Sequence, residues 1–159
     1  MNITITSLSV QHQRSGFTCG EESLEIYLQR YAKQDAKRRI SRVFVASPVE
    51  SPEQVVGYYT LSAYSFSPDA MPEERRRRLP GYPVPAVMLG RLAIDQGCQR
   101  AGLGRILVAD ALQRVKQASE VVAVYALAVD ALHKEAAAYY QQFGFIAFKD
   151  QPLKLFLPL

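Results

Sequence analysis

The stretch from residue 89 to residue 107, LGRLAIDQGCQRAGLGRIL, limits the possible folds more than any other part of the chain. Leu92 and Ile94 indicate a buried strand, and a segment with helical character starts at Gly104. Two further glycines punctuate the short loop between them. With a strongly apolar strand expected at 121–129, the stretch predicts a β-α-β unit.

The loop from Gln99 to Gly104 is the first candidate for a binding site. Glycines let several backbone N–H groups turn toward one point, and the start of the next helix adds unpaired amides and the positive end of its dipole. Such a point attracts phosphate, so the loop is a candidate anion cradle. The alternative is a glycine-bearing turn that only connects two core elements, because short glycine motifs have many false matches.

The length of 159 residues predicts one domain, residues 1–159, with a core that needs no metal or disulfide. Cys19, Cys98, His12 and His133 match neither a disulfide framework nor a zinc-binding spacing. The amino terminus lacks the basic start and apolar run of a signal peptide, and no stretch has the length of a membrane span. We therefore expect a soluble cytoplasmic protein without bound metal.

The rest of the chain alternates predicted strands and helices. We expect strands at 3–6, 43–46, 55–66, 121–129, 145–148 and 153–157, and helices at 21–38, at 104–114 and within 130–143. On the first helix, Leu24, Tyr27, Leu28 and Tyr31 recur at helical spacing and predict a buried face. The order of elements predicts an α/β (α+β) fold: a mixed, mostly antiparallel sheet of about six to seven strands with helices on both faces.

Basic residues are clustered, although the net charge is only +4. Four consecutive arginines, Arg75, Arg76, Arg77 and Arg78, lie in an exposed, proline-rich segment at 68–85, and a second cluster runs from Lys33 to Arg42. The first cluster is explained if its arginines are simply solvated on the surface. The second is explained by the stabilising effect of cations at a helix C-terminus. Because four adjacent guanidinium groups repel one another, an acidic partner such as a phosphate backbone is the competing interpretation.

Two motifs stand in order along the second half of the chain. Residues 99–104, QRAGLG, follow a strand and open a helix, and residues 140–145, YQQFGF, end the last helix. Together they resemble the GNAT superfamily of acetyl-CoA-dependent N-acetyltransferases, which has the loop (Arg or Gln)-x-x-Gly-x-(Gly or Ala) and the ending Tyr-x-x-x-Gly-Phe. A dinucleotide-binding motif does not fit, because the first glycine of G-x-G-x-x-G is absent. The resemblance implies a GNAT fold and acetyl-CoA as cofactor.

Three further blocks, 17–28, 57–62 and 85–95, resemble the GNAT toxins of bacterial toxin–antitoxin pairs. This resemblance implies acetylation of the α-amine of aminoacyl-tRNA, a small ribbon-helix-helix antitoxin as partner, and a homodimer. An α-amine, with a pKa of about 7.7–8.0, is partly neutral at cytoplasmic pH and makes weak demands for a general base. Two alternatives stay open: a GNAT enzyme that acetylates a small amine or a protein N-terminus, and a non-catalytic domain that only binds CoA or nucleic acid.

The resemblance also implies roles for single residues. The N–H of Ile94 polarises the thioester carbonyl, and Tyr140 is the acid that protonates the leaving thiolate, while Tyr139 packs in the core. Apart from the resemblance, their positive charge makes Arg91, the four arginines at 75–78 and the cluster from Lys33 to Arg42 candidates for binding phosphates of the substrate. The base is unassigned among Glu21, Glu22 and Asp130. The cofactor-binding set is Leu92, Ala93, Ile94, Gln99, Arg100, Ala101, Gly102, Leu103, Gly104, Arg105, Asp130 and Tyr140.

Overall fold

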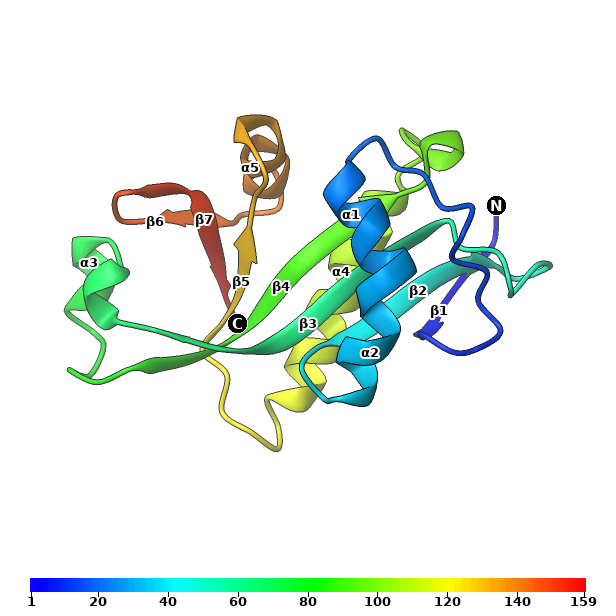
Figure 1. Cartoon of the computed structure of the whole chain (residues 1–159). Coiled ribbons are helices and arrows are strands. Elements are labelled where there is room, and N and C mark those ends of the chain that lie inside the picture. The colour runs from blue at the N-terminus through cyan, green and yellow to red at the C-terminus, as the bar shows by residue number, and fades with distance from the viewer. The chain divides into compact units, whose positions relative to one another are not determined.

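The computed structural model describes all residues from Met1 to Leu159 and contains seven strands. They are β1 (Ile3–Ser7), β2 (Arg42–Pro48), β3 (Gly57–Phe66), β4 (Val84–Ile94), β5 (Ala126–Asp130), β6 (Ile146–Phe148) and β7 (Gln151–Pro158). The strands form one sheet in the order β1-β2-β3-β4-β5-β7-β6 (Figure 1). The pairs β1–β2, β2–β3, β5–β7 and β6–β7 are antiparallel, and β4–β5 is parallel. The prediction of a mixed, mostly antiparallel sheet is confirmed.

The helical elements lie between the strands. They are α1 (Glu22–Ile26), η1 (Tyr27–Tyr31), α2 (Ala32–Lys37), η2 (Pro68–Ala70), α3 (Glu73–Arg76), η3 (Gln96–Cys98), α4 (Leu103–Ala118) and α5 (Lys134–Gln141). The chain divides into a first compact unit, residues 1–62 and 90–113, and a second one, residues 63–89 and 114–159. Both units contain part of the sheet.

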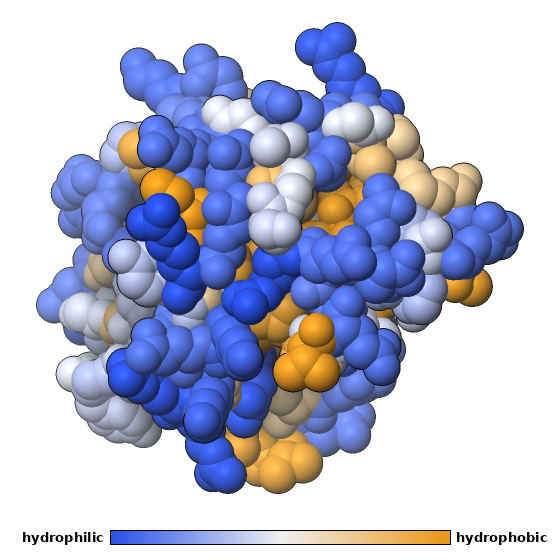
Figure 2. Space-filling view, turned by 45° about the vertical axis from the view of Figure 1, so that its right-hand side comes forward, coloured by the Kyte–Doolittle hydropathy of each residue, from blue (hydrophilic) through white to orange (hydrophobic).

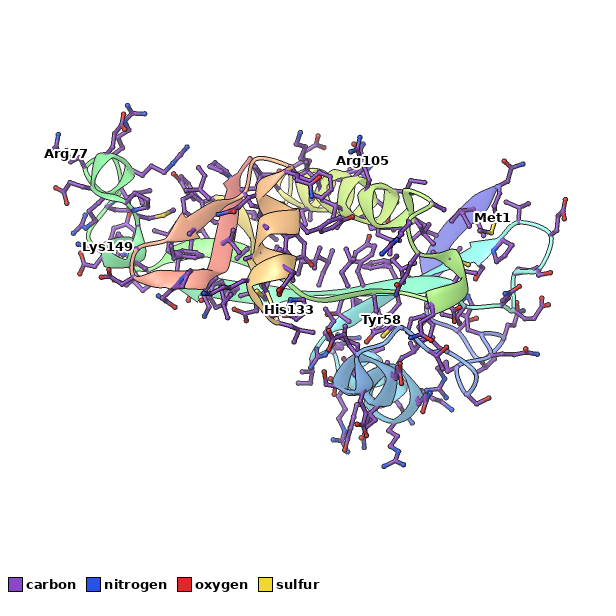
Figure 3. The ribbon with its side chains drawn as sticks, turned by 90° about the horizontal axis from the view of Figure 1, so that it is seen from above. Met1, Tyr58, Arg77, Arg105, His133 and Lys149 are labelled. Carbon is purple, nitrogen blue, oxygen red and sulfur yellow. The ribbon has the colours of Figure 1, made fainter.

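In the first unit, two adjacent tyrosines of β3 show that helices cover both faces of the sheet. The hydroxyl of Tyr58 donates to the carbonyl oxygen of Leu24 in α1 at 2.6 Å, and that of Tyr59 donates to Oδ2 of Asp110 in α4 at 2.5 Å. Successive side chains of a strand point to opposite faces, so α1 and α4 lie on opposite sides of β3 (Figure 3). The core between α1 and the sheet includes Phe17, Leu28, Val45 and Tyr58.

The first helix contains a π-helical turn, η1, in which the N–H of Ala32 donates to the carbonyl oxygen of Tyr27. The prediction that Tyr31 belongs to the buried face is wrong, because its exposed fraction is 51 % while Ala32 is fully buried. A π turn accommodates one extra residue and so shifts the buried face around the helix. Leu24, Tyr27 and Leu28, which come before the shift, are buried as predicted.

In the second unit, the core is formed mainly by side chains of β3 to β7. Phe66, Met88, Ala128, Phe148 and Phe156 are all buried in one cluster. Helix α5 packs on β7 and buries Ala137 and Tyr140.

Several predicted boundaries differ from the structure. The strand expected from Val121 starts only at Ala126, and Val121 and Val122 are exposed. The reason is that α4 continues past Arg114 to Ala118, whose carbonyl oxygen accepts the N–H groups of both valines in a turn. Strand β4, which Leu92 and Ile94 indicated, extends back to Val84 and includes an exposed proline.

No helix of the structure combines the length and the apolar character needed to cross a membrane. Figure 2 shows one face of the molecule, on which hydrophilic side chains predominate and apolar residues form separate spots.

Candidate active site

The end of β4 packs closely against β3 in the first unit. A Cβ atom added to Gly57 would lie 3.1 Å from the carbonyl oxygen of Ala93, 3.1 Å from Cδ1 of Ile94 and 3.2 Å from Cδ1 of Leu107. A side chain at this point of β3 therefore fits only if the neighbouring atoms move by a few tenths of an ångström. The Cβ added to Gly57 would thus meet the side chains of both Ile94 and Leu107. Because Leu107 belongs to α4, the side chain of Ile94 lies on the face of the sheet that α4 covers.

We expect Gly57→Ala to lower the free energy of unfolding by about 1–3 kcal/mol, because overpacking against the backbone forces β4 to move. Denaturant unfolding measures this change. Gly81→Ala is the matched control, since no atom lies within 4 Å of its added Cβ. A Gly57→Ala protein as stable as this control would contradict the close packing at Ile94.

A network of hydrogen bonds ties the segment before α1 to the residues after β4. Oδ2 of Asp95 accepts the N–H of Thr18 at 3.3 Å, and the N–H of Gln96 donates to the carbonyl oxygen of Thr18 at 2.7 Å. The side-chain amide of Gln99 donates to the carbonyl oxygens of Cys19 at 2.9 Å and Ile94 at 3.0 Å. The side chain of Gln99, a predicted cofactor-binding residue, thus holds the loop against the end of β4.

The loop after η3 has the backbone shape of an anion cradle. Arg100 and Gly102 have φ values of +68° and +79°, in the left-handed region, which is uncommon for arginine and turns successive N–H groups in new directions. A Cβ added to Gly102 would meet no atom within 4 Å, so the space beside it is open. The loop is therefore shaped for a ligand that approaches the backbone closely.

The start of α4 adds further donors to this loop. The N–H of Ile106 donates to the carbonyl oxygen of Gly102, so the N–H groups of Leu103 and Gly104 come before the helical hydrogen-bond pattern begins. The first turn holds no acidic residue, and Arg105 adds positive charge where the helix dipole is already positive. Both the dipole and the positive charge attract phosphate, so the residues fit the pyrophosphate of a CoA cofactor.

Arg91 is on the other face of β4 from Ile94. Its guanidinium carbon lies 3.5 Å from the centre of the Tyr27 ring, and Ala93, two residues further on, packs in the same core as Tyr27. Arg91 therefore faces α1 and η1. The sequence did not reveal this pairing, because the spacing of Tyr27 indicated only a core residue.

In the second unit, Tyr140 is a buried residue of α5, with an exposed fraction of 7 %. Its ring packs edge to face on Phe145, with ring centres 5.6 Å apart. Burial, with a smaller effect of Tyr139, raises the pKa of Tyr140 above its ordinary value, so the phenol stays protonated at neutral pH. The prediction that Tyr139 is the core member of the pair is wrong, because Tyr139 is only partly buried.

Asp130 stands at the end of β5 in the second unit. Its Oδ1 lies 3.8 Å from Nζ of Lys154, which also donates to the hydroxyl of Tyr64 at 3.2 Å. An ion-paired carboxylate with a half-exposed side chain has no feature of a general base. The acidic candidates Glu21 and Glu22 precede and open α1 in the first unit.

The four arginines at 75–78 have partners within the second unit. Arg76 Nε lies 2.7 Å from Asp69 Oδ1, Arg77 Nε lies 3.6 Å from Glu73 Oε1, and Arg78 Nη2 lies 3.9 Å from Glu74 Oε1. The guanidinium carbon of Arg75 lies 5.7 Å from the ring centre of Phe156. Arg77 extends outward from α3 (Figure 3). Neighbouring carboxylates thus offset the expected repulsion between the arginine side chains. These ion pairs are exposed and contribute little to stability.

The cysteines are not disulfide-bonded. Burial raises the pKa of both Cys19 and Cys98, so neither is a ready thiolate nucleophile. No group of three or more His, Cys, Asp and Glu side chains could hold a metal ion.

Residues 9–145 match the Acetyltransferase (GNAT) family. The chain belongs to the GNAT family of acetyltransferases. It is 38% identical over 143 residues to the "tRNA-acetylating toxin" of Mycobacterium tuberculosis, and the match covers 90% of this chain and 84% of that protein. The cradle, the strand that ends at Ile94 and the helix that carries Tyr140 are thus parts of a GNAT domain.

Two solved structures are similar over nearly the whole GNAT domain. AtaT complexed with acetyl-methionyl-tRNAfMet has a TM-score of 0.91 and 34% identity, with 99% of this chain and 95% of that chain covered. A Tyr-to-Phe mutant of the AtaT toxin, bound to the C-terminus of the antitoxin AtaR and acetyl-CoA, has a TM-score of 0.84 and 33% identity, with 98% and 92% covered.

Proposed function

We propose that this GNAT enzyme transfers the acetyl group of acetyl-CoA to the α-amine of an aminoacyl-tRNA and acts as the toxin of a toxin–antitoxin pair. The observation that carries the proposal is the similarity, over nine-tenths of the chain, to a tRNA-acetylating toxin. The structural likeness to AtaT complexed with an acetylated aminoacyl-tRNA supports the same acceptor. Blocking the amine of a charged tRNA prevents its use in peptide-bond formation, which explains toxicity.

Acetyl-CoA supplies the acetyl thioester. The N–H groups of the loop 99–102 and of the first turn of α4 would bind its pyrophosphate, which has open space beside Gly102. The strand segment from Leu92 to Ile94 aligns the pantetheine arm, and the N–H of Ile94 donates to the carbonyl oxygen of the thioester. The amine then attacks the polarised carbonyl carbon directly, without a nucleophilic side chain.

Tyr140 supplies the proton for the departing thiolate. A thiolate has a conjugate acid with a pKa near ~8.5, so a phenol can protonate it only when the two are directly hydrogen-bonded. The raised pKa of Tyr140 keeps the proton on the phenol until the thiolate forms. An α-amine needs no strong base to become neutral, which fits the lack of an evident one.

A basic groove in the first unit supports a polyanionic substrate. It has a volume of about 590 Å³, and two glutamines and five cations line it, with no acidic residue among them. The cations are Arg14, Arg30, Lys33, Lys37 and Arg38. The structure thus gathers part of the cluster predicted at 33–42. Arg42 is engaged elsewhere, with the carbonyl oxygen of Ala36 at 3.3 Å. A small cationic amine calls for an acidic pocket, whereas this groove favours phosphates.

We expect replacement of Arg75–Arg78 by alanine to weaken tRNA binding and leave acetyl-CoA affinity nearly unchanged. The fall of log affinity with log salt should flatten by roughly 0.7 to 0.9 for each phosphate that the variant no longer binds. Binding titrations at several salt concentrations measure both. If the variant keeps the tRNA affinity of the wild type and its dependence on salt, the four arginines are only solvated surface residues.

The matched control for this prediction is the double variant Glu73→Gln with Glu74→Gln. It removes the ion-pair partners of Arg77 and Arg78 but keeps every arginine, so tRNA binding should not weaken. A loss of acetyl-CoA affinity in the arginine variant would instead assign the run to the 3′-phosphate of the cofactor.

Partners follow from the same proposal. Because AtaT is seen bound to its antitoxin, we expect a cognate antitoxin for this protein, and the resemblance to GNAT toxins indicates a small ribbon-helix-helix protein. The same resemblance indicates a homodimer. Charged tRNA is used in the cytoplasm, so we place the protein there.

The test of the proposed function is a comparison of acceptors with radiolabelled acetyl-CoA. Total charged tRNA should take up label, whereas uncharged tRNA, polyamines and peptides with a free N-terminus should not. Label in polyamines or peptides, with none in charged tRNA, would instead identify the alternative GNAT activities.

A further inference from the structure

We propose that Tyr27 is a positioning residue: it holds the guanidinium of Arg91 ready for a phosphate near the 3′ end of the acceptor. The proposal rests on the proposed function, because it assigns Arg91 to an aminoacyl-tRNA. It begins from the packing of the two side chains, in which the guanidinium carbon of Arg91 lies 3.5 Å from the centre of the Tyr27 ring. At this distance a flat guanidinium touches the ring and is attracted by its π electrons.

The donors of Arg91 are available in this arrangement. Arg91 makes no hydrogen bond or ion pair with another side chain, although it is partly buried on β4. Stacking occupies the face of the guanidinium and leaves its in-plane N–H groups for bidentate binding of a phosphate. A free arginine loses side-chain entropy when it binds, and the stack removes part of that cost in advance.

Tyr27 is itself held by two contacts besides the one with Arg91. Its hydroxyl donates to Oδ2 of Asp35 at 2.8 Å, and its ring stacks on Tyr58 with ring centres 6.4 Å apart and an interplanar angle of 15°. The hydroxyl of Tyr58 is bound in turn to the carbonyl oxygen of Leu24. Burial and the hydrogen bond to Asp35 raise the pKa of Tyr27 to about 12, so the phenol remains neutral. Tyr27 is also the first residue of η1, and π turns often occur at functional sites.

The place of Arg91 on β4 suits binding of the acceptor. It lies three positions before Ile94, which corresponds to about 10 Å along a strand. An aminoacyl-tRNA whose α-amine reaches the thioester carbonyl at Ile94 brings the phosphates of its terminal nucleotides to this distance. Arg91 faces α1 and Ile94 faces α4, so the phosphate and the thioester do not compete for the same side of the strand.

The experiment compares Tyr27→Leu with Tyr27→Phe in steady-state kinetics on charged tRNA. Tyr27→Leu removes the ring and should raise the KM for aminoacyl-tRNA by about three-fold to thirty-fold, with the KM for acetyl-CoA unchanged. Tyr27→Phe keeps the ring and should stay near the wild type. In an Arg91→Lys background, Tyr27→Leu should have no further effect on the KM for aminoacyl-tRNA, because the stacked guanidinium is already gone.

Different failures are distinguishable. If Tyr27→Leu raises the KM for aminoacyl-tRNA equally whether position 91 holds arginine or lysine, Tyr27 is only a structural residue. The same conclusion follows if Tyr27→Leu raises the KM for aminoacyl-tRNA and the KM for acetyl-CoA equally. Arg91→Lys alters no core side chain and should itself raise the KM for aminoacyl-tRNA, so an unchanged KM would overturn the proposal even if Tyr27→Leu fails to fold. A wild-type protein that acetylates no charged tRNA would overturn the proposed function and this inference together.

Discussion

Tyr140→Phe is expected to lower turnover by about ten-fold to a thousand-fold and to leave the affinity for acetyl-CoA nearly unchanged. The substitution removes the phenolic proton donor and keeps the ring that packs edge to face on Phe145. Because the ring packing remains, we expect the stability to change little. Single-turnover kinetics with charged tRNA measures the chemical step, and calorimetry measures acetyl-CoA binding.

Tyr139→Phe is the matched control for the same hydroxyl deletion. Tyr139 is adjacent in α5 but points about 100° away around the helix, and its ring packs on Phe143 with 5.1 Å between ring centres. Its loss of turnover should be mild. Equal losses in the two variants, or full turnover by Tyr140→Phe, would remove Tyr140 from the role of acid.

Gly102→Val is expected to abolish detectable binding of acetyl-CoA. Gly102 has a φ of +79°, which a β-branched residue adopts only with strain, and its added side chain would enter the open space beside the loop. That space is where the pyrophosphate approaches the backbone. Gly104→Val is expected to have the same effect, because a β-branched side chain at Gly104 would obstruct the approach of the pyrophosphate to the N–H groups that precede the helical hydrogen bonds of α4. Calorimetric titration with acetyl-CoA is the measurement.

Gly81→Val is the control for Gly102→Val. Both positions lack neighbouring atoms within 4 Å of an added Cβ, but only Gly102 has a positive φ and belongs to the cradle. Gly81→Val should therefore bind acetyl-CoA like the wild type. Retained binding by a folded Gly102→Val protein would place the cofactor elsewhere.

The sequence was most informative where one short segment determines its own structure. The run 99–104 predicted a strand-loop-helix connection, and the structure has it, with helix α4 starting one residue earlier, at Leu103. Strand and helix identities followed from hydrophobic periodicity because each element buries one face. The shift at η1 could not be predicted, since Tyr31 and Ala32 are both acceptable on a buried face and a π turn has no periodic signal of its own.

Interactions between segments far apart in the chain could not be predicted from the sequence. Gln99 reaches Cys19 and Ile94, and Arg91 reaches Tyr27, across separations that no local pattern records. The arginine run shows the opposite case: its partners Glu73 and Glu74 stand one helical turn away, so their pairing could have been anticipated from i,i+4 spacing. Valines at 121 and 122 misled the strand prediction, because apolar residues in a turn after a helix resemble the start of a strand.

The most direct test of the account is to identify the acetylated atom. Charged tRNA is incubated with the protein and acetyl-CoA, digested with a nuclease, and the 3′-terminal aminoacyl-adenosine is analysed by mass spectrometry. We predict an acetyl group on the α-nitrogen of the esterified amino acid, present only with charged tRNA and lost with Tyr140→Phe at early times. An unmodified aminoacyl-adenosine, or an acetyl group on a nucleobase instead, would contradict the account.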